Sequence, residues 1–150
     1  MPFSSRFLMP FLLAVLLATA VGSIIQTQYN LAALQAIGAP IPLAVRLRTT
    51  GLDLLGFSPL FGLLVLAGFV FAIPAAVWSS RALPALRWPL FALAGALAVL
   101  LTLFLVNALA PMPTLIGANR TVAGTLGLMA SGSVGALLFA ALSRTVRVRS

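Results

Sequence analysis

The chain has 150 residues, of which 62% are hydrophobic and 7% are charged, and its formal net charge is +8 at neutral pH. Soluble domains contain about 25% charged residues, so this composition indicates an all-α integral membrane protein. Histidine, cysteine, lysine and glutamate are absent, and Asp53 is the only acidic residue. Paired-carboxylate, triad, cysteine-nucleophile and Schiff-base catalysis are therefore excluded within one chain, as are transition-metal and haem sites. We expect a protein that is not an enzyme and has no cofactor and no metal centre.

Four apolar runs are long enough to cross a bilayer, because about 20 helical residues span about 30 Å of hydrocarbon. The runs contain 19 to 22 residues each and cover 7–25, 59–78, 89–110 and 122–142. The first run also has features of a secretory signal, with Arg6 before it and "ATA" at 18–20, but its apolar character continues to Ile25 and favours an uncleaved span. The prediction is one membrane domain, a four-transmembrane-helix antiparallel bundle.

The connection at 26–58 is expected to be an outer cap with one or two short helices. "TQYNLAALQAIG" predicts a helix that ends at a left-handed Gly38, either separate from the first span or extending it. "PIPLAVRLRTTGL" predicts a second helix, with Pro42 in its first turn and Gly51 as its left-handed stop. Ser58 and Pro59 are the predicted N-cap and first residue of the second span.

A fifth span over 31–50 is disfavoured by its arginines, each of which costs about 2.5–3.5 kcal/mol at the centre of a membrane helix. The cap is therefore expected to lie on the surface or to be partly re-entrant. Asp53 is expected to be the counter-ion of Arg46, Arg48 or Arg120, since an unpaired carboxylate is unfavourable at the membrane edge. The alternatives are a ligand or proton site, or a plain solvated residue.

The arginines predict the orientation. With both termini in the cytoplasm of a cell with an inner membrane, the inner segments hold six arginines and the outer ones three, which follows the positive-inside bias. Anionic lipid headgroups are the expected partners of the inner group, Arg81, Arg87, Arg144, Arg147 and Arg149. The basic tail at 143–150 also alternates in a way that suits a short strand against a protein partner. No lysine-rich tail or aromatic platform indicates nucleic acid.

Small residues predict where helices approach closely. In the fourth run they recur at every fourth position, which lets helix backbones come together in lipid: Ala123, Gly127, Ser131 and Gly135. Weaker versions of the pattern occur in the other three runs, at Ala14/Ala18/Gly22, Gly68/Ala72/Ala76 and Ala94/Ala98/Thr102.

Two functions fit these features. The first is an accessory or structural subunit, which packs against a larger membrane complex or assembles with copies of itself. The second is a small oligomeric transporter or channel for a small solute or lipid. Such a path normally needs polar or charged groups at depth, and the third and fourth runs offer only hydroxyls and one amide: Thr102, Asn107, Ser131 and Ser133.

Overall fold

The structure, a computed structural model, describes residues 5–109 and 116–145, with side chains from 7 to 109 and from 116 to 143. Its elements in chain order are α1 (Ser5–Ala36), α2 (Leu43–Gly56), α3 (Ser58–Ala82), the 3-10 turn η1 (Pro84–Leu86), α4 (Arg87–Leu109), the 3-10 turn η2 (Gly117–Arg120) and α5 (Val122–Thr145). No strand occurs among these residues. Four segments of the described chain are long and apolar enough to cross a membrane, Phe7–Ala36, Ser58–Ala82, Pro84–Leu109 and Val122–Ser143. They indicate a multi-pass membrane protein.

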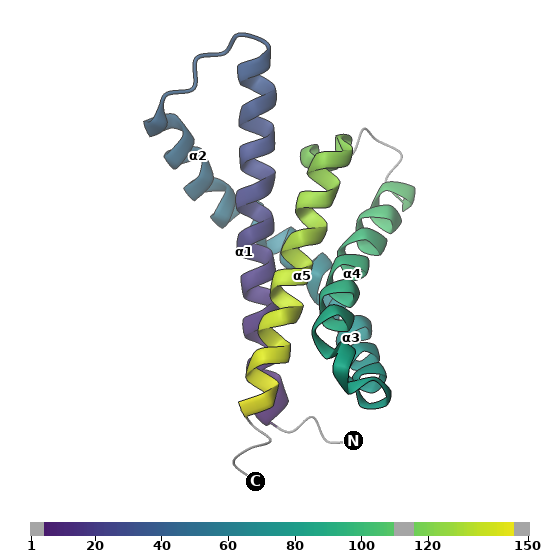
Figure 1. Cartoon of the computed structure of the whole chain (residues 1–150). Helices are drawn as coiled ribbons and strands as arrows, with labels where there is room; N and C mark the ends of the chain where they lie inside the picture. The colour runs from purple at the N-terminus through teal and green to yellow at the C-terminus, as the bar shows by residue number, and fades with distance from the viewer. Residues whose placement is uncertain (1–4, 110–115, 146–150) are drawn as a thin grey trace.

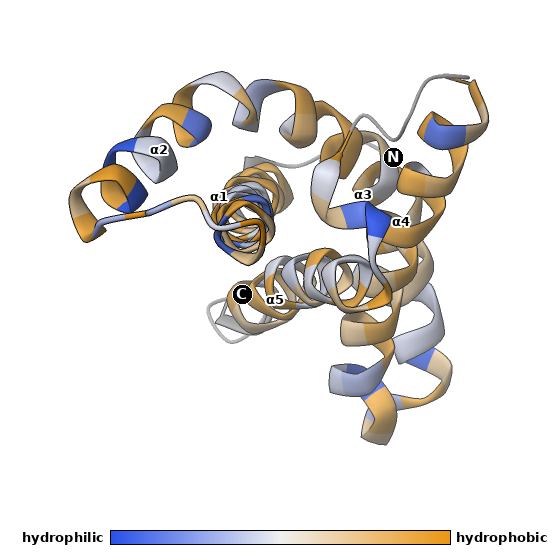
Figure 2. Cartoon of the chain, turned by 90° about the horizontal axis from the view of Figure 1, so that it is seen from above, coloured by the Kyte–Doolittle hydropathy of each residue, from blue (hydrophilic) through white to orange (hydrophobic). Residues whose placement is uncertain are grey.

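Among the four long helices, α1 and α5 pack along each other (Figure 1). The Ser5 end of α1 and the Thr145 end of α5 lie at the same end of the molecule, and the Ala36 end of α1 projects beyond the other helices (Figure 1). Seen from above, α2 and the start of α3 curve around one side of α1, whereas α5 lies on another side (Figure 2). The α4 helix packs between α3 and α5.

The α1 helix continues without a break through 26–36, so this segment extends the first span instead of forming a separate helix. Its 32 residues are about 48 Å long at about 1.5 Å per residue, well beyond the hydrocarbon thickness. The helix ends as predicted, with Gly38 at a φ of 90°. The Gly38 N–H donates to the Gln35 carbonyl at 3.0 Å and the Ala39 N–H to the Leu34 carbonyl at 3.1 Å. This geometry uses the positive φ that glycine adopts without strain.

The predicted end of α2 at Gly51 is wrong, because the helix continues to Gly56. The predicted N-cap at Ser58 is also wrong, since Phe57 precedes α3 in a helical conformation and Ser58 already lies in the first turn. The Phe57 N–H donates to the Asp53 carbonyl at 2.8 Å, and the Phe61 N–H donates to the Phe57 carbonyl at 3.1 Å. The chain therefore passes from α2 into α3 almost as one bent helix. A glycine ends a helix only when a left-handed turn is favoured over further hydrogen bonding, and here Asp53 keeps the next turn of α2 against α1.

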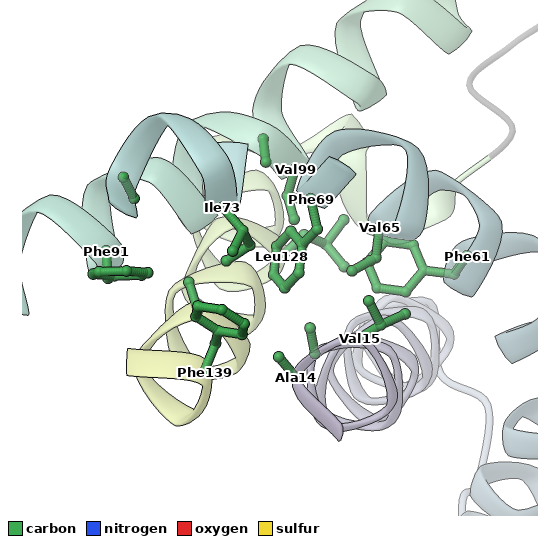
Figure 3. Packing of buried hydrophobic residues seen from close by; sticks show 14 of the residues in the cluster. Ala14, Val15, Phe61, Val65, Phe69, Ile73, Phe91, Val99, Leu128 and Phe139 are labelled. Carbon is green, nitrogen blue, oxygen red and sulfur yellow. The ribbon is translucent and has the colours of Figure 1, made fainter. Parts of the chain in front are cut away.

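The core is a narrow stripe of side chains between the helices. On α3 its members recur at every fourth residue, Phe61, Val65, Phe69 and Ile73, and they meet Phe91 of α4 and Phe139 of α5 (Figure 3). Phe91 and Phe139 stack with ring centroids 5.9 Å apart. The other faces of these helices expose large apolar side chains such as Leu63 and Phe71. In a membrane those faces meet lipid, so the helices are held by close packing rather than by removal from water.

The predicted small-residue stripe of α5 packs on α1 within the same chain. A Cβ on Gly135 would lie 2.5 Å from the Ala14 carbonyl oxygen and 2.7 Å from the Ala18 Cβ. One turn earlier, Ser131 is fully buried. Its neighbour on α1 is Gly22, whose added Cβ would lie 3.0 Å from the Ser131 Oγ. The weaker stripe at Ala14/Ala18/Gly22 therefore forms the other half of this contact.

The outer members of the α5 stripe are less enclosed. Gly127 is half-buried against α1, where an added Cβ would lie 3.0 Å from Ile25 Cγ2. Ala123 is exposed and takes no part in the contact. On the other side of the bundle, Gly68 of α3 packs against Ala98 of α4, with 3.1 Å between an added Cβ and the Ala98 Cβ. The weak patterns at Gly68 and Ala98 thus meet each other.

The α4–α5 contact was not expected from the sequence. Gly95 and Gly132 face each other so closely that a Cβ on either would collide with the backbone carbonyl of the other. Both glycines are buried. The absence of a side chain is therefore required here for reasons of space, since both residues have ordinary helical backbone angles.

We expect one substitution, glycine to alanine, to have opposite effects at two helical sites. Gly95→Ala should destabilise the fold by about 1–3 kcal/mol, because a backbone carbonyl has to move. Gly51→Ala should stabilise it by about 0.4–1 kcal/mol, because α2 is helical there and no atom lies within 4 Å of the added Cβ. Thermal unfolding in mild detergent measures both shifts, and shifts of the same sign would contradict this account of the packing.

Candidate functional site

Four polar residues stand close together on the mostly apolar α1 helix: Gln26, Thr27, Gln28 and Asn30. Gln26 and Thr27 are buried, and Gln28 is half-buried. All four contact other elements, Thr27 and Gln28 on α2 and Gln26 and Asn30 on η2. This polar cluster, residues 26–30, is the candidate functional site, because it brings three elements and the single carboxylate of the chain to one place.

Toward α2, the cluster meets a polar face that the helix presents at i, i+4 and i+7: Arg46, Thr50 and Asp53. Two glutamine side chains hold Arg46, whose Nη1 donates to Gln28 Oε1 at 2.6 Å and whose Nη2 donates to Gln35 Oε1 at 2.8 Å. The Gln28 amide in turn donates to Thr50 Oγ1 at 3.1 Å. The two bonds from the Arg46 guanidinium have a charged donor and are of the stronger kind. Together with the Gln28–Thr50 bond they keep α2 beside α1.

The Asp53 carboxylate bonds a hydroxyl, whereas the sequence had predicted an arginine as its counter-ion. The Thr27 hydroxyl lies 2.7 Å from Asp53 Oδ2 and 3.0 Å from the Ser23 carbonyl oxygen. Among the described residues, no hydrogen bond or ion pair joins this carboxylate to Arg46 or Arg48.

The physical reason is spacing along α2. Arg46 is seven residues before Asp53, about 10 Å along the helix axis, and its guanidinium reaches toward Gln35, away from the carboxylate. Arg48 is exposed, and Arg120 belongs to η2. Asp53 itself is half-buried, so it is not a plainly solvated residue.

Toward η2, the same cluster holds the turn before α5. The buried Gln26 accepts a hydrogen bond from the Ala118 N–H at 2.8 Å through its Oε1. Gly117 lies against the Asn30 side chain, which leaves no room for a Cβ. At the start of α5, Thr125 donates to Asn119 Oδ1 at 2.8 Å. The start of α5 is therefore set by α1 as well as by its own turn.

The predicted lipid-contacting arginines divide into two kinds. Arg81 is exposed at the end of α3. Arg87 is half-buried and turned inward, where its Nη2 donates to the Ala140 carbonyl at 2.9 Å and to Ser143 Oγ at 2.8 Å. Its guanidinium also lies 5.0 Å from the centre of the Phe91 ring. A cation at the carboxyl end of α5 is favoured by the helix dipole, so Arg87 joins α4 to α5. The Arg144 side chain, Arg147 and Arg149 lie outside the described residues.

Sequence reasoning missed the role of 26–30, although a signal was present. Polar side chains at the end of a membrane helix need partners, because the lipid interior supplies none. Three consecutive polar residues followed by an asparagine therefore indicated contacts on more than one side of α1. What they bind depends on helices that are distant in sequence.

Chemically, the site offers one carboxylate, two hydroxyls, four amides (Gln26, Gln28, Asn30 and Gln35) and a guanidinium held by two of those amides. Among the described residues no three or more His, Cys, Asp or Glu side chains gather in a way that would hold a metal ion. Comparison of the chain with protein-family models, curated proteins and solved structures found no match. The functional argument therefore rests on the geometry of the chain itself.

We expect the two arginines of α2 to differ, although the sequence made them equal candidates. Arg46→Gln should destabilise the protein by about 1–3 kcal/mol, because two bonds from a charged donor are lost and two glutamine oxygens lose their donor. Arg48→Gln, the matched control, should change stability by less than about 0.5 kcal/mol, since its side chain is exposed. Equal melting temperatures for the two variants would mean that the α1–α2 contact does not depend on Arg46.

Proposed function

We propose that this protein is a non-catalytic small subunit of an inner membrane, which packs against another membrane protein or against copies of itself. The observation that supports this is the exposure of α2. Its polar face is occupied by α1, and no residue of α2 is buried. A helix held in place by one face offers the other face for contact.

The exposed surface of α2 is mostly apolar and carries one cationic side chain, Arg48. Leu43, Leu47 and Leu55 are 70%, 64% and 78% exposed, and Arg48 is exposed near them. Leucine clusters of this kind suit burial against another helix. Arg48 sets a further condition, since a partner that covers it has to supply an acceptor, such as a carboxylate or a carbonyl oxygen.

In the proposed arrangement the four spans form an antiparallel bundle, with both termini and η1 on the cytoplasmic side and α2 on the outer side. The arginine distribution of six to three supports this orientation. Arg81 and the basic residues of the tail contact anionic lipid headgroups on the inner leaflet. Trp78 and Trp88, which are exposed on either side of η1, suit the headgroup level of the same leaflet.

A second candidate function is a small transporter or channel built from several copies. The buried hydroxyls of Thr19 and Ser23 on α1 and of Ser58 on α3, which have no hydrogen-bond partner, favour it over a purely structural role. In this alternative the copies together line the path, because a single chain carries only one acidic residue.

The orientation is tested with single cysteines, since the chain has no native cysteine. Ile37→Cys, at a site 81% exposed beyond α1, should react with a membrane-impermeant maleimide on intact cells. Ala85→Cys, at an exposed site in η1, should react only after the membrane is permeabilised. Ser80 is unsuitable for this purpose because it is buried. Labelling of Ala85→Cys from outside would reverse the proposed orientation.

The packing role is tested by the stoichiometry of the complex purified in mild detergent. Leu47→Ser with Leu55→Ser should remove the partner or the second copy, and Arg48→Gln should weaken the association at least tenfold if an acceptor meets it. These variants should melt within a few degrees of the wild-type chain, because none of the three side chains is buried in its fold. Leu101→Ser, an exposed leucine on α4, is the matched control. An unchanged stoichiometry in the α2 variants would refute α2 as the contact surface.

A further inference from the structure

Three buried hydroxyls in this structure differ from the others. Serine and threonine side chains in helices usually donate to a carbonyl oxygen one turn earlier, and Thr27, Thr102 and Ser131 do so here. Among the described residues, the buried hydroxyl oxygens that lack any partner are Thr19 Oγ1, Ser23 Oγ and Ser58 Oγ. Thr19 is 7% exposed and Ser23 is 0% exposed, so bulk water does not reach either side chain.

These hydroxyls lie along one seam between α1 and α3. A Cβ on Gly62 would be 3.3 Å from Thr19 Oγ1, which sets the register of the two helices. Ser58 is one turn before Gly62 on α3, and Ser23 is one turn after Thr19 on α1, so helix periodicity places both on the same side of that contact. Because Gly22 contacts Phe61 and Gly62 contacts Thr19, the two helices run past each other in opposite directions here, and this register places Ser23 and Ser58 at the same level of the seam.

The seam continues to the carboxylate. One further turn along α1 is Thr27, whose Oγ1 lies 2.7 Å from Asp53 Oδ2 and 3.0 Å from the Ser23 carbonyl oxygen. Thr27 has only one hydroxyl proton to give, so Asp53 Oδ2 competes for it with the Ser23 carbonyl oxygen, which as part of α1 also accepts a backbone N–H. Along this seam, hydrogen bonds therefore join only Thr27 Oγ1, Asp53 Oδ2 and the Ser23 carbonyl oxygen, and the hydroxyls of Ser23 and Ser58 are left without partners.

A buried polar group without a partner is unfavourable by about 1–3 kcal/mol, and native proteins fill such positions with ordered water or a bound ion. The atoms gathered here are oxygens of a carboxylate, hydroxyls and a backbone carbonyl, which are the ligands that hard cations prefer. The guanidinium on the same face of α2, that of Arg46, is held by Gln28 and Gln35. One carboxylate balances one positive charge, which favours a monovalent ion over a divalent one.

We propose that Asp53, Thr27, Ser23 and Ser58 form a binding site for a monovalent cation of the size of Na⁺ or K⁺. The sequence had predicted no metal centre, because it contains no cluster of His, Cys or acidic residues. A search of the sequence for such clusters does not find a site made of hydroxyl and carbonyl oxygens, since these groups occur throughout any membrane helix. The proposal does not rest on the packing role, and such a site would give the transport alternative an ion-binding group at the outer ends of the spans.

The test is the melting temperature of the purified chain in detergent, at constant pH and ionic strength, with NaCl or KCl titrated against N-methylglucamine chloride. Ligand that binds only the folded state raises the melting temperature, by roughly 3–6 °C for a chain of this size at about ten times the dissociation constant. We expect a saturating rise with at least one of the two small cations and none with the organic cation, which is too large for the seam.

Two variants link that rise to the site. Asp53→Asn should abolish it by removing the charge, and Ser23→Ala should lower the apparent affinity at least tenfold by removing a buried ligand. Ser133→Ala and Arg48→Gln are the controls and should retain the full rise, because Ser133 bonds the Ala92 carbonyl at 2.8 Å on α4 and Arg48 is exposed. The same melting temperature in all three salts would overturn the proposal in favour of ordered water alone. A cation effect that survives both Asp53→Asn and Ser23→Ala would overturn it as well.

Discussion

The arrangement of this protein depends on the need to give hydrogen-bond partners to the polar side chains of α1 at 26–30. Where lipid replaces water, an unpaired amide or hydroxyl is unfavourable by several kcal/mol, so a helix with several such groups has to gather other elements around them. Thr27 and Gln28 bond α2, and Gln26 bonds η2, where Asn30 lies against Gly117. The two connections that are farthest apart in the sequence, after α1 and before α5, are thereby joined to the same turn of α1. The contacts of the C-terminal third of α1 therefore determine the positions of α2 and of the start of α5.

The spans themselves are held by a different force. Their surfaces are apolar toward lipid and toward each other, so close approach decides which helices pair. Gly95 against Gly132 and Gly135 against Ala14 bring α5 into backbone contact with α4 on one side and α1 on the other. At the opposite end from the polar cluster, Arg87 donates to the last turns of α5. The α5 helix is therefore fixed at both ends by polar contacts and between them by small residues.

This division has a functional consequence at α2. The helix has no core contacts of its own and is placed by its bonds to α1 and by its continuity with α3. The proposed cation site and the proposed packing surface therefore share one helix, with Asp53 toward the seam and the leucines toward the outside. A cation at Asp53 would add to the forces that hold α2 and so would favour the conformation that presents those leucines.

The sequence by itself determined the features that depend on composition and on local backbone preference. Four apolar stretches of sufficient length, the left-handed stop at Gly38 and the small-residue stripe of α5 all follow from residues close together in the chain. It did not determine the partner of Asp53, because two arginines nearby in sequence are less well placed than a threonine that lies 26 residues away. It did not determine the end of α2 either, since Gly51 is compatible with a stop or with a continuing helix and the contact of the next turn with α1 decides between them. The sequence likewise did not determine the Gly95–Gly132 contact or the unpartnered hydroxyls of Thr19, Ser23 and Ser58. Both depend on which atoms of a neighbouring helix lie opposite these residues, and only the packing of the helices decides that.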